Sequence, residues 1–288
     1  MRSCPLPQML RKYIAPGWLL IAPFLLLLLA LYFGPILNIL WLSFTDPTPG
    51  LENYEKLITS DSLARIIWTT VRVCLLTTGF SVLIGYCIAY AMVHANQKKQ
   101  NAMLALLLIS FWISVLVRTF SWLMLLGTNG LLNNSLEALN IISEPIAFVR
   151  NELGVLIGMV HYMVPYAVLP LLANMQGLDT RVIQASRNLG ATGGQTFRKV
   201  YLPLTKPGLV ASSLLVFILS LGFYVTPAIL GGGKVLMVAE YISVQLLVTL
   251  KWGTAAMLAA LMLFGVMALL YIMSRFMKLS TAFGGASS

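Results

Sequence analysis

The sequence predicts an all-α integral membrane protein with six transmembrane helices. Apolar residues make up 59% of the chain and charged residues only 10%, whereas a soluble domain has about 25% charged residues. Six apolar blocks each reach the roughly 20 residues that a helix needs to cross about 30 Å of hydrocarbon. A span must satisfy its own backbone hydrogen bonds, which favours helices. The blocks are Gly17–Leu42, Ile66–Val93, Ala102–Leu126, Leu153–Met175, Leu209–Leu230 and Trp252–Phe276.

The first block resembles a secretory signal, because Arg11 and Lys12 precede a leucine-rich run. The run continues past the length of a signal core, and no small-x-small cleavage site closes it. We therefore expect an uncleaved first helix.

The net charge of +10 is distributed beside the apolar blocks, which is typical of membrane orientation rather than nucleic-acid binding. One set of alternate loops is basic and holds a single acid, Asp179, while the other set mixes both signs. The positive-inside rule therefore predicts a multi-pass protein in contact with the lipid bilayer. It places both termini (1–16 and 277–288) and the loop 175–206 in the cytoplasm. No nucleic-acid partner is expected.

The cytoplasmic loop predicts two short helices. The first would run from Leu178 to Leu189 and end at Gly190, and the second would run from Gln195 to Tyr201 and stop at Pro203. The first helix carries an apolar stripe that suits docking into a protein groove: Leu178, Val182, Ala185 and Leu189. The alternative is a basic helix lying on anionic headgroups.

Part of this loop resembles the "EAA" signature of permease subunits of bacterial type I ABC importers. The matching order is Gln184-Ala185-Ser186, Gly190, Val200 and Leu202-Pro203. Gln184 stands where the family usually has Glu, and Ser186 where it has a second Ala. Two further segments, 118–130 and 222–232, are similar to the spermidine/putrescine branch of that family.

The resemblance implies the type I importer permease fold, with a permease domain over 17–276. The second to sixth helices would form a five-helix core, and the N-terminal helix would pack outside it. It also implies two ATPase subunits that hydrolyse ATP-Mg, a second and different permease chain, and a periplasmic solute-binding protein at the bacterial inner membrane. This chain would bind no cofactor or metal and carry no catalytic residue. The residues implied to couple to the ATPase are Asp179, Gln184, Ala185, Ser186, Gly190, Ala191, Leu202 and Pro203.

Arg118 falls inside the third block, where a charge costs about 2.5–3.5 kcal/mol on insertion scales. Arg118 either faces a cavity or a partner, or extends its side chain to the lipid headgroups. For Arg72 we expect the side chain to reach the headgroups. Pro165 predicts a kink in the fourth helix beside His161. This kink either lines a transport pathway or only serves helix packing. The candidate substrate pathway is Arg118, Trp122, Tyr162, Tyr166, Phe223, Tyr224 and Thr226. The solute would be a polyamine, an amino acid or a related compound, and aromatic faces would hold a polyamine through cation–π contacts.

Two other functions compete with a permease driven by a separate ATPase. An ion-coupled secondary transporter usually places acidic groups at mid-membrane, and the predicted spans hold none. An intramembrane enzyme would need a partner for His161, which the spans do not offer. The chain also lacks the glycine-rich phosphate loop of an ATPase, so ATP would be hydrolysed elsewhere.

Overall fold

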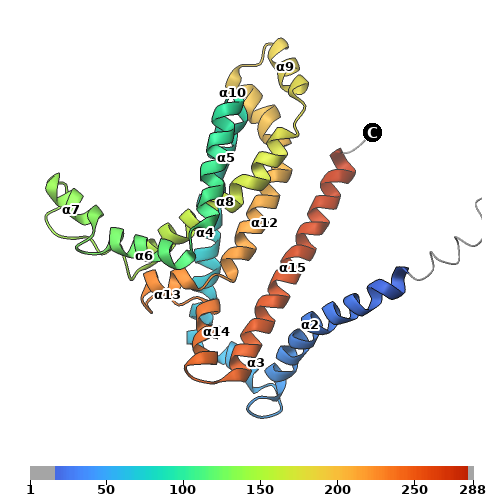
Figure 1. Ribbon diagram of the computed structural model, residues 1–288, viewed down its shortest axis with the longest axis vertical. Coiled ribbons are helices and arrows are strands. Elements are labelled where there is room, and N and C mark those ends of the chain that lie inside the picture. The colour runs from blue at the N-terminus through green and yellow to red at the C-terminus, as the bar shows by residue number, and fades with distance from the viewer. Residues whose placement is uncertain (1–16, 285–288) are drawn as a thin grey trace, which may run out of the picture. The chain divides into compact units, whose positions relative to one another are not determined.

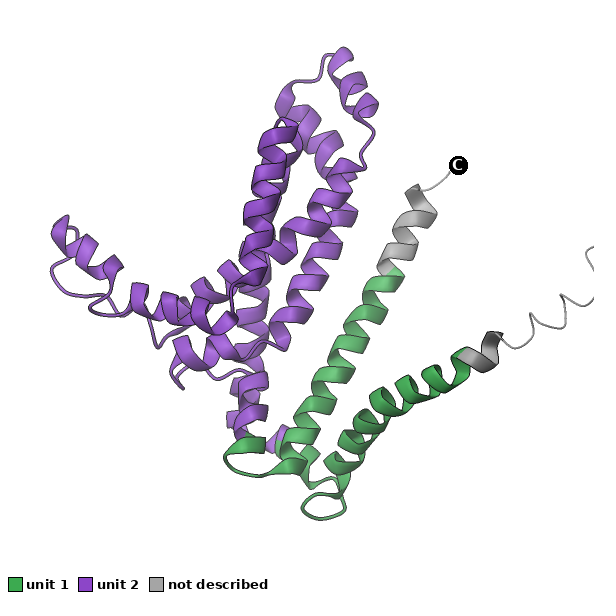
Figure 2. Cartoon of the chain, viewed as in Figure 1, with its two compact units in different colours: residues 1–56, 245–288 green, residues 57–244 purple. Residues whose placement is uncertain are grey.

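The computed structural model describes residues 17–284, and the side chains of 21–275. The predicted cytoplasmic N-terminus (1–16) lies outside the described residues. Of the predicted C-terminal tail (277–288), only the backbone up to residue 284 is described, and it is helical. Two compact units divide the chain: residues 1–56 with 245–288, and residues 57–244 (Figure 2).

The first unit pairs the first and last helices, α2 (Gly17–Thr45) and α15 (Trp252–Gly284). The turn that follows α2 leads into α3 (Glu52–Thr59). This turn is fastened to the start of α15, because the Asp46 carboxylate accepts from the backbone N–H of Gly253 at 2.6 Å. The Asn53 amide donates to the carbonyl of Asp46 at 2.7 Å. These bonds satisfy polar groups at a helix junction.

The second unit is a bundle in which α4, α8 and α12 pack on one another. Figure 1 shows α9 and α10 at one end of this bundle, called the α9 end below, and α6 and α13 towards the other. The helical segments that begin in this unit are α4 (Asp61–His94), α5 (Gln97–Trp112), α6 (Val115–Leu126), α7 (Leu131–Ala138), α8 (Glu152–Gln176), α9 (Thr180–Asn188), α10 (Gly193–Thr196), the π-helical turn η1 (Phe197–Tyr201), α11 (Leu202–Leu204), α12 (Lys206–Leu221), α13 (Val225–Gly231) and α14 (Val238–Leu247).

Small residues let the bundle helices approach closely. Ser81, Gly85 and Ala89 recur every fourth residue on α4 and are buried, which is the pattern that membrane helices use at tight crossings. A Cβ atom added to Gly85 would lie 2.9 Å from the Cβ atom of Ala167 on α8. The α4–α8 crossing is therefore close-packed at this point.

Helices were found where four blocks predicted them, as α2, α4, α8 and α15. Five helices of the described chain pass a length and hydropathy test for a membrane span, or six if one bent pair is counted. The bent pair joins Gly193–Leu204 to Lys206–Leu221 at 58°. This count agrees with the six spans expected.

The prediction of one continuous helix over Ala102–Leu126 was wrong. The chain leaves helical geometry at Ile113 (ψ 123°) and Ser114 (ψ 138°), so α5 and α6 are separate helices. The block Leu209–Leu230 is likewise divided into α12 and α13. Apolar composition does not report whether the backbone ladder is continuous, so hydropathy could not detect either break.

Arg72 does not need to snorkel, because it forms an ion pair with Glu152 at the start of α8. The guanidinium and the carboxylate are both partly exposed. A partly exposed pair of this kind contributes modestly to stability, but it gives Arg72 an acidic partner within the chain.

Glu240 on α14, a helix of ten residues, is a buried acid, because its side chain is 7% exposed and Oε2 has no hydrogen-bond partner among the described residues. Burial raises the pKa of Glu240 from 4.5 to about 7, against a smaller lowering by the backbone of Met237. The folded protein therefore binds this proton more tightly than the unfolded chain. Stability should fall as pH rises from about 4.5 to about 7, and the loss should be complete above that range.

The Glu240→Gln variant should therefore be more stable than wild type at pH 8, by at most about 3 kcal/mol. The two proteins should melt together near pH 4.5, where the buried charge is lost from wild type. The melting temperature in detergent at both pH values checks this. A Gln variant that is less stable than wild type at pH 8 would mean that the ionised carboxylate is stabilised by more than the Met237 backbone.

Candidate functional site

The segment between α8 and α12, residues 177–205, forms a folded cap at the α9 end and is called the α8–α12 loop. Asp179 begins α9, because its carboxylate accepts from the backbone N–H of Arg181 at 2.9 Å. Gly190 follows the helix with φ +82°, a left-handed conformation that favours glycine. The Ala191 N–H then donates to the Ser186 carbonyl at 3.1 Å. Asp179 and Gly190 thus set the two ends of α9.

The α9 helix presents an apolar surface to its surroundings. Within the described structure none of its residues is buried, and Val182, Ala185 and Leu189 are exposed, Leu189 to 88%. The inclusion of Leu178 in this stripe was wrong. Leu178 precedes the helix and packs with Ile183 against the bundle core. The exposed stripe therefore consists of Val182, Ala185 and Leu189.

Ser186 joins α9 to the next turn of the loop. Its hydroxyl lies 2.9 Å from the carbonyl oxygen of Ile183 and 3.1 Å from the hydroxyl of Thr196 in α10. Thr196 is 3% exposed. An alanine at position 186 could not make the contact with Thr196, so the serine adds a polar tie between the two halves of the loop.

A hollow of about 300 Å³ lies beside α9. It brings together three of the residues predicted to couple to an ATPase, Ser186, Gly190 and Ala191. The other five, Asp179, Gln184, Ala185, Leu202 and Pro203, do not line it. The full lining is Ser186, Leu189, Gly190, Ala191, Gln195, Lys199 and Val200.

The prediction of a single second helix from Gln195 to Tyr201 that stops at Pro203 was wrong. The chain makes a short α-helical turn, α10, then the π-helical turn η1, and continues as α11 over Pro203. The Leu202 N–H donates to the carbonyl of Phe197, five residues back. Pro203 has no N–H for an α-type bond to Lys199, which accounts for the wider turn preceding it.

Arg118 fastens the break between α5 and α6. It is 8% exposed, and its guanidinium donates to the carbonyl of Ser110 and lies 3.5 Å from that of Ile113. It also lies 4.9 Å from the centre of the Tyr162 ring. The end of a helix carries partial negative charge and unpaired carbonyls. The charge of Arg118 is thus engaged by the end of α5 rather than by the headgroups.

Four of the seven residues predicted for a substrate pathway lie together, namely Arg118, Tyr162, Tyr166 and Phe223. The ring of Tyr162 is 5.8 Å from that of Tyr166 and 4.5 Å from that of Phe223. Sequence reasoning missed Phe111, whose ring is 4.9 Å from Tyr166. No motif marks Phe111, because its position depends on the break in the third block.

The other three predicted pathway residues are placed differently. Thr226 is 2% exposed, and its hydroxyl bonds with that of Thr119 at 3.2 Å, which ties α13 to α6. Tyr224 is 48% exposed. Trp122 donates to Nδ1 of His161 at 3.2 Å.

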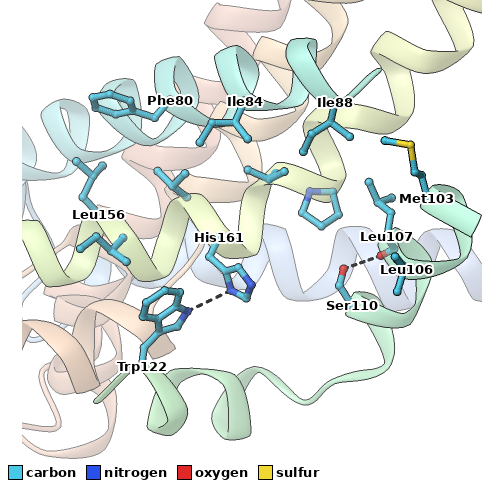
Figure 3. Close-up of a pocket in the computed structure, with 14 residues that line it drawn as sticks. Phe80, Ile84, Ile88, Met103, Leu106, Leu107, Ser110, Trp122, Leu156 and His161 are labelled. Carbon is cyan, nitrogen blue, oxygen red and sulfur yellow. Dashed lines mark hydrogen bonds between the residues drawn. The ribbon is translucent and has the colours of Figure 1, made fainter. Parts of the chain in front are cut away.

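Trp122 and His161 lie at an apolar cavity of about 770 Å³ between α4, α5, α6 and α8. Figure 3 shows their hydrogen bond on one side of this cavity and Ser110 on the other. The remaining lining is apolar. Although α8 contains Pro165 and Pro170, it continues through both as one helix.

The described residues offer no group of three or more His, Cys, Asp or Glu side chains placed to hold a metal ion. Cys74 is buried and Cys87 is exposed, and both thiols are free.

A known family matches residues 81–279 of this chain, which include the α8–α12 loop and both broken helices. Its description is "Binding-protein-dependent transport system inner membrane component". The chain belongs to this family. It is therefore a transport permease subunit of an ABC importer, inserted in the inner membrane by several helices. The ATPase of such systems is a separate subunit.

Among the curated relatives is the spermidine/putrescine transport system permease protein PotB of Haemophilus influenzae. It is 34% identical over 223 residues, which cover 77% of the permease and 78% of the relative. PotB of Escherichia coli is 32% identical over 232 residues, covering 80% and 84%. Neither the ion-coupled nor the intramembrane-enzyme hypothesis finds support among these relatives.

Solved structures confirm the fold. A chain of a bacterial ABC transporter involved in the import of the acidic polysaccharide alginate matches with a TM-score of 0.71 and 17% identity. The match covers 93% of the permease and 99% of that chain. A chain of the MetNI methionine ABC transporter in an inward-facing conformation matches with a TM-score of 0.56 and 19% identity, covering 75% and 95%.

Proposed function

We propose that this permease imports a polyamine or a closely related small amine. The observation that carries the proposal is the 32–34% identity to permeases named for spermidine and putrescine, over about four fifths of the chain. The clustered rings of Tyr162, Tyr166 and Phe223 supply faces that attract ammonium groups. The positive charge of Arg118 opposes such a solute near Tyr162, whose ring it already faces at 4.9 Å. Its hydrogen bonds to the carbonyls at the end of α5 reduce this repulsion without cancelling it.

The assembly that supports this function contains two ATPase subunits, a second and different permease chain, and a periplasmic binding protein that delivers the solute. ATP-Mg is held by the ATPase subunits, and this chain holds no cofactor. Both termini and the α8–α12 loop face the cytoplasm in this proposal. The reason is that the loop carries Arg181, Arg187, Arg198 and Lys199 against the single acid Asp179.

In this assembly α9 is the coupling helix, and its exposed stripe of Val182, Ala185 and Leu189 seats in a groove of an ATPase subunit. Asp179 and Gly190 set its ends, and Ser186 and Ala191 hold it to the rest of the loop. Gln184 meets the partner without the charge that a glutamate would bring. Closure of the ATPase dimer on ATP moves α9 and thereby opens the pathway to the periplasmic side.

The isolated permease should show no ATP hydrolysis, and hydrolysis should appear when its ATPase subunits are added. Replacing Gly190 with valine should uncouple the complex. A β-branched residue is strained at φ +82° and would distort the end of α9. We expect uptake per ATP hydrolysed to fall about 10-fold or more, in the range of a typical coupling free energy. Proteoliposomes loaded with ATP, with binding protein outside, provide the measurement.

The matched control is Gly193→Val in the same loop. No atom lies within 4 Å of a Cβ added there, and its φ is not positive, so coupling should be retained. The same proteoliposomes identify the solute: labelled spermidine and putrescine should accumulate, and an excess of an amino acid should not compete. Strong hydrolysis by the isolated chain would contradict the permease role, and uptake only of amino acids would contradict the choice of solute.

A further inference from the structure

Five aromatic side chains pack where the α8–α12 loop meets α4, and we call them the aromatic clamp: Tyr86, Tyr90, His94, Phe197 and Tyr201. Tyr86, Tyr90 and His94 recur every fourth residue on α4, so they share one face of that helix. Phe197 and Tyr201 are the first and last residues of η1, with rings 5.9 Å apart and nearly parallel. The clamp therefore joins two rows of rings from two elements.

Tyr90 is the centre of the clamp. Its ring meets those of Phe197 and Tyr201 edge to face, at 5.8 and 5.3 Å, an arrangement that stabilises beyond simple burial. His94 lies 4.1 Å from Tyr90 and 6.0 Å from Tyr201. Tyr201 is only 5% exposed. The η1 turn is thus held by its rings to the last three turns of α4.

Two polar ties extend the clamp in both directions. The Ser186 hydroxyl contacts Thr196 at 3.1 Å, which attaches α9 to the residue directly before η1. The Tyr86 hydroxyl lies 3.1 Å from that of Thr205, which is fully buried at the start of α12. Contacts therefore run without a gap from the exposed α9 helix, through η1, to α4 and α12.

The π-helical turn sets which rings face α4. In an α-helix successive residues advance by 100°, whereas the wider π turn advances less, so its presence changes the direction of Phe197 relative to Tyr201. Pro203 has no N–H for an α-type bond to Lys199, and its ring crowds that carbonyl. The preceding residue, Leu202, donates to Phe197 and not to Arg198. Pro203 thus favours the turn that presents both rings to Tyr90.

We infer that the aromatic clamp is the rigid link that carries movement of the coupling helix into the membrane bundle, with Tyr90, Phe197 and Pro203 as its positioning residues. The inference rests on the proposed function of α9. The α9 helix has no buried residue of its own among those described, and it packs on the bundle core through the partly buried Ile183. Its neighbouring elements in the loop are α10 and η1. The clamp connects it to α4, which packs on both α8 and α12.

The test uses Tyr90→Leu, Phe197→Leu and the double variant in the complete complex with ATPase and binding protein. Each leucine keeps an apolar side chain and removes the edge-to-face contact. The ATPase should co-purify in the wild-type ratio and still hydrolyse ATP, while uptake per ATP falls about 10-fold. Because both changes break one link, the double variant should be no worse than either single variant.

Tyr90→Phe keeps the ring and should retain wild-type coupling. Trp68→Leu is the matched control, since it removes an exposed ring near the opposite end of α4 and should not affect coupling. Pro203→Ala restores an N–H and should lower coupling without a change in the ATPase ratio. Wild-type coupling in Tyr90→Leu, or losses that multiply in the double variant, would overturn the inference.

These outcomes are distinct from failure of the proposed function. If the wild-type permease does not bind an ATPase through the α8–α12 loop, the ATPase is absent from the wild-type preparation itself. If the leucine variants merely misfold, their melting temperatures fall and the ATPase no longer co-purifies with them. In that case wild-type coupling in both Tyr90→Phe and Pro203→Ala would contradict a linking role for the clamp.

Discussion

Replacing Gly85 with leucine is expected to prevent correct folding of the permease. A Cβ atom at this position lies 2.9 Å from that of Ala167 and 3.4 Å from backbone atoms of Ala167 and Val168. Because backbone cannot move aside like a flexible side chain, α4 and α8 must separate. Overpacking of a core costs about 1–3 kcal/mol when side chains can adjust, and we expect the upper end of that range or more. Size-exclusion profiles and melting temperatures of detergent-extracted protein measure the effect.

Gly79→Leu is the matched control for Gly85→Leu, because it lies on the same helix and a Cβ atom added there meets nothing within 4 Å. It should extract and melt like wild type. Gly85→Ala should fall between the two, since it introduces the Cβ contact without the longer side chain. A Gly85→Leu protein that melts like wild type would mean that α4 and α8 do not cross closely at this point.

Replacing Arg118 with methionine should destabilise the permease and abolish transport. The change removes the donor to the carbonyls of Ser110 and Ile113 and the contact with Tyr162. Leaving a buried polar group unpaired costs about 1–3 kcal/mol, so we expect a loss within that range when the carbonyls at the end of α5 lose their donor. The melting temperature and spermidine uptake should fall together.

Arg118→Lys separates charge from geometry. Lysine keeps the positive charge but lacks the planar fork that reaches two carbonyls, so stability should be only partly restored. If Arg118 instead acts by contacting the solute, Arg118→Met would keep the wild-type melting temperature and change the solute concentration needed for half-maximal uptake. That result would contradict its role as the fastener of the broken helix.

The location of the α8–α12 loop and three of the four residues of its apolar stripe could be predicted from the sequence, but the position of Leu178 could not. The charge of the loop and the spacing from Ala185 to Pro203 are local features, visible along the chain. The side chain of Leu178 was assigned to the wrong surface because the carboxylate of Asp179 begins α9 at Thr180 and leaves Leu178 outside the helix. A shift of the helix start by two residues is enough to change which side chains are exposed.

The aromatic clamp, too, could be predicted from the sequence only in part. The spacing of Tyr86, Tyr90 and His94 is visible in the sequence, and on a helix it places the three rings on one face. Their partners, Phe197 and Tyr201, lie more than a hundred positions later in the chain, in a π-helical turn that propensity does not predict. Only the packed bundle brings the two rows of rings together.

By itself the sequence determined the class of the protein, the number of apolar blocks and the position of the α8–α12 loop. Those properties follow from transfer of apolar residues into lipid, from the placement of basic residues and from a signature of adjacent positions, all of which act locally. Only the tertiary structure decided where the third and fifth blocks break, what Arg118 binds and how α9 connects to α4. These depend on contacts between residues far apart in the chain, whose backbone and side-chain groups find partners only after the helices have packed.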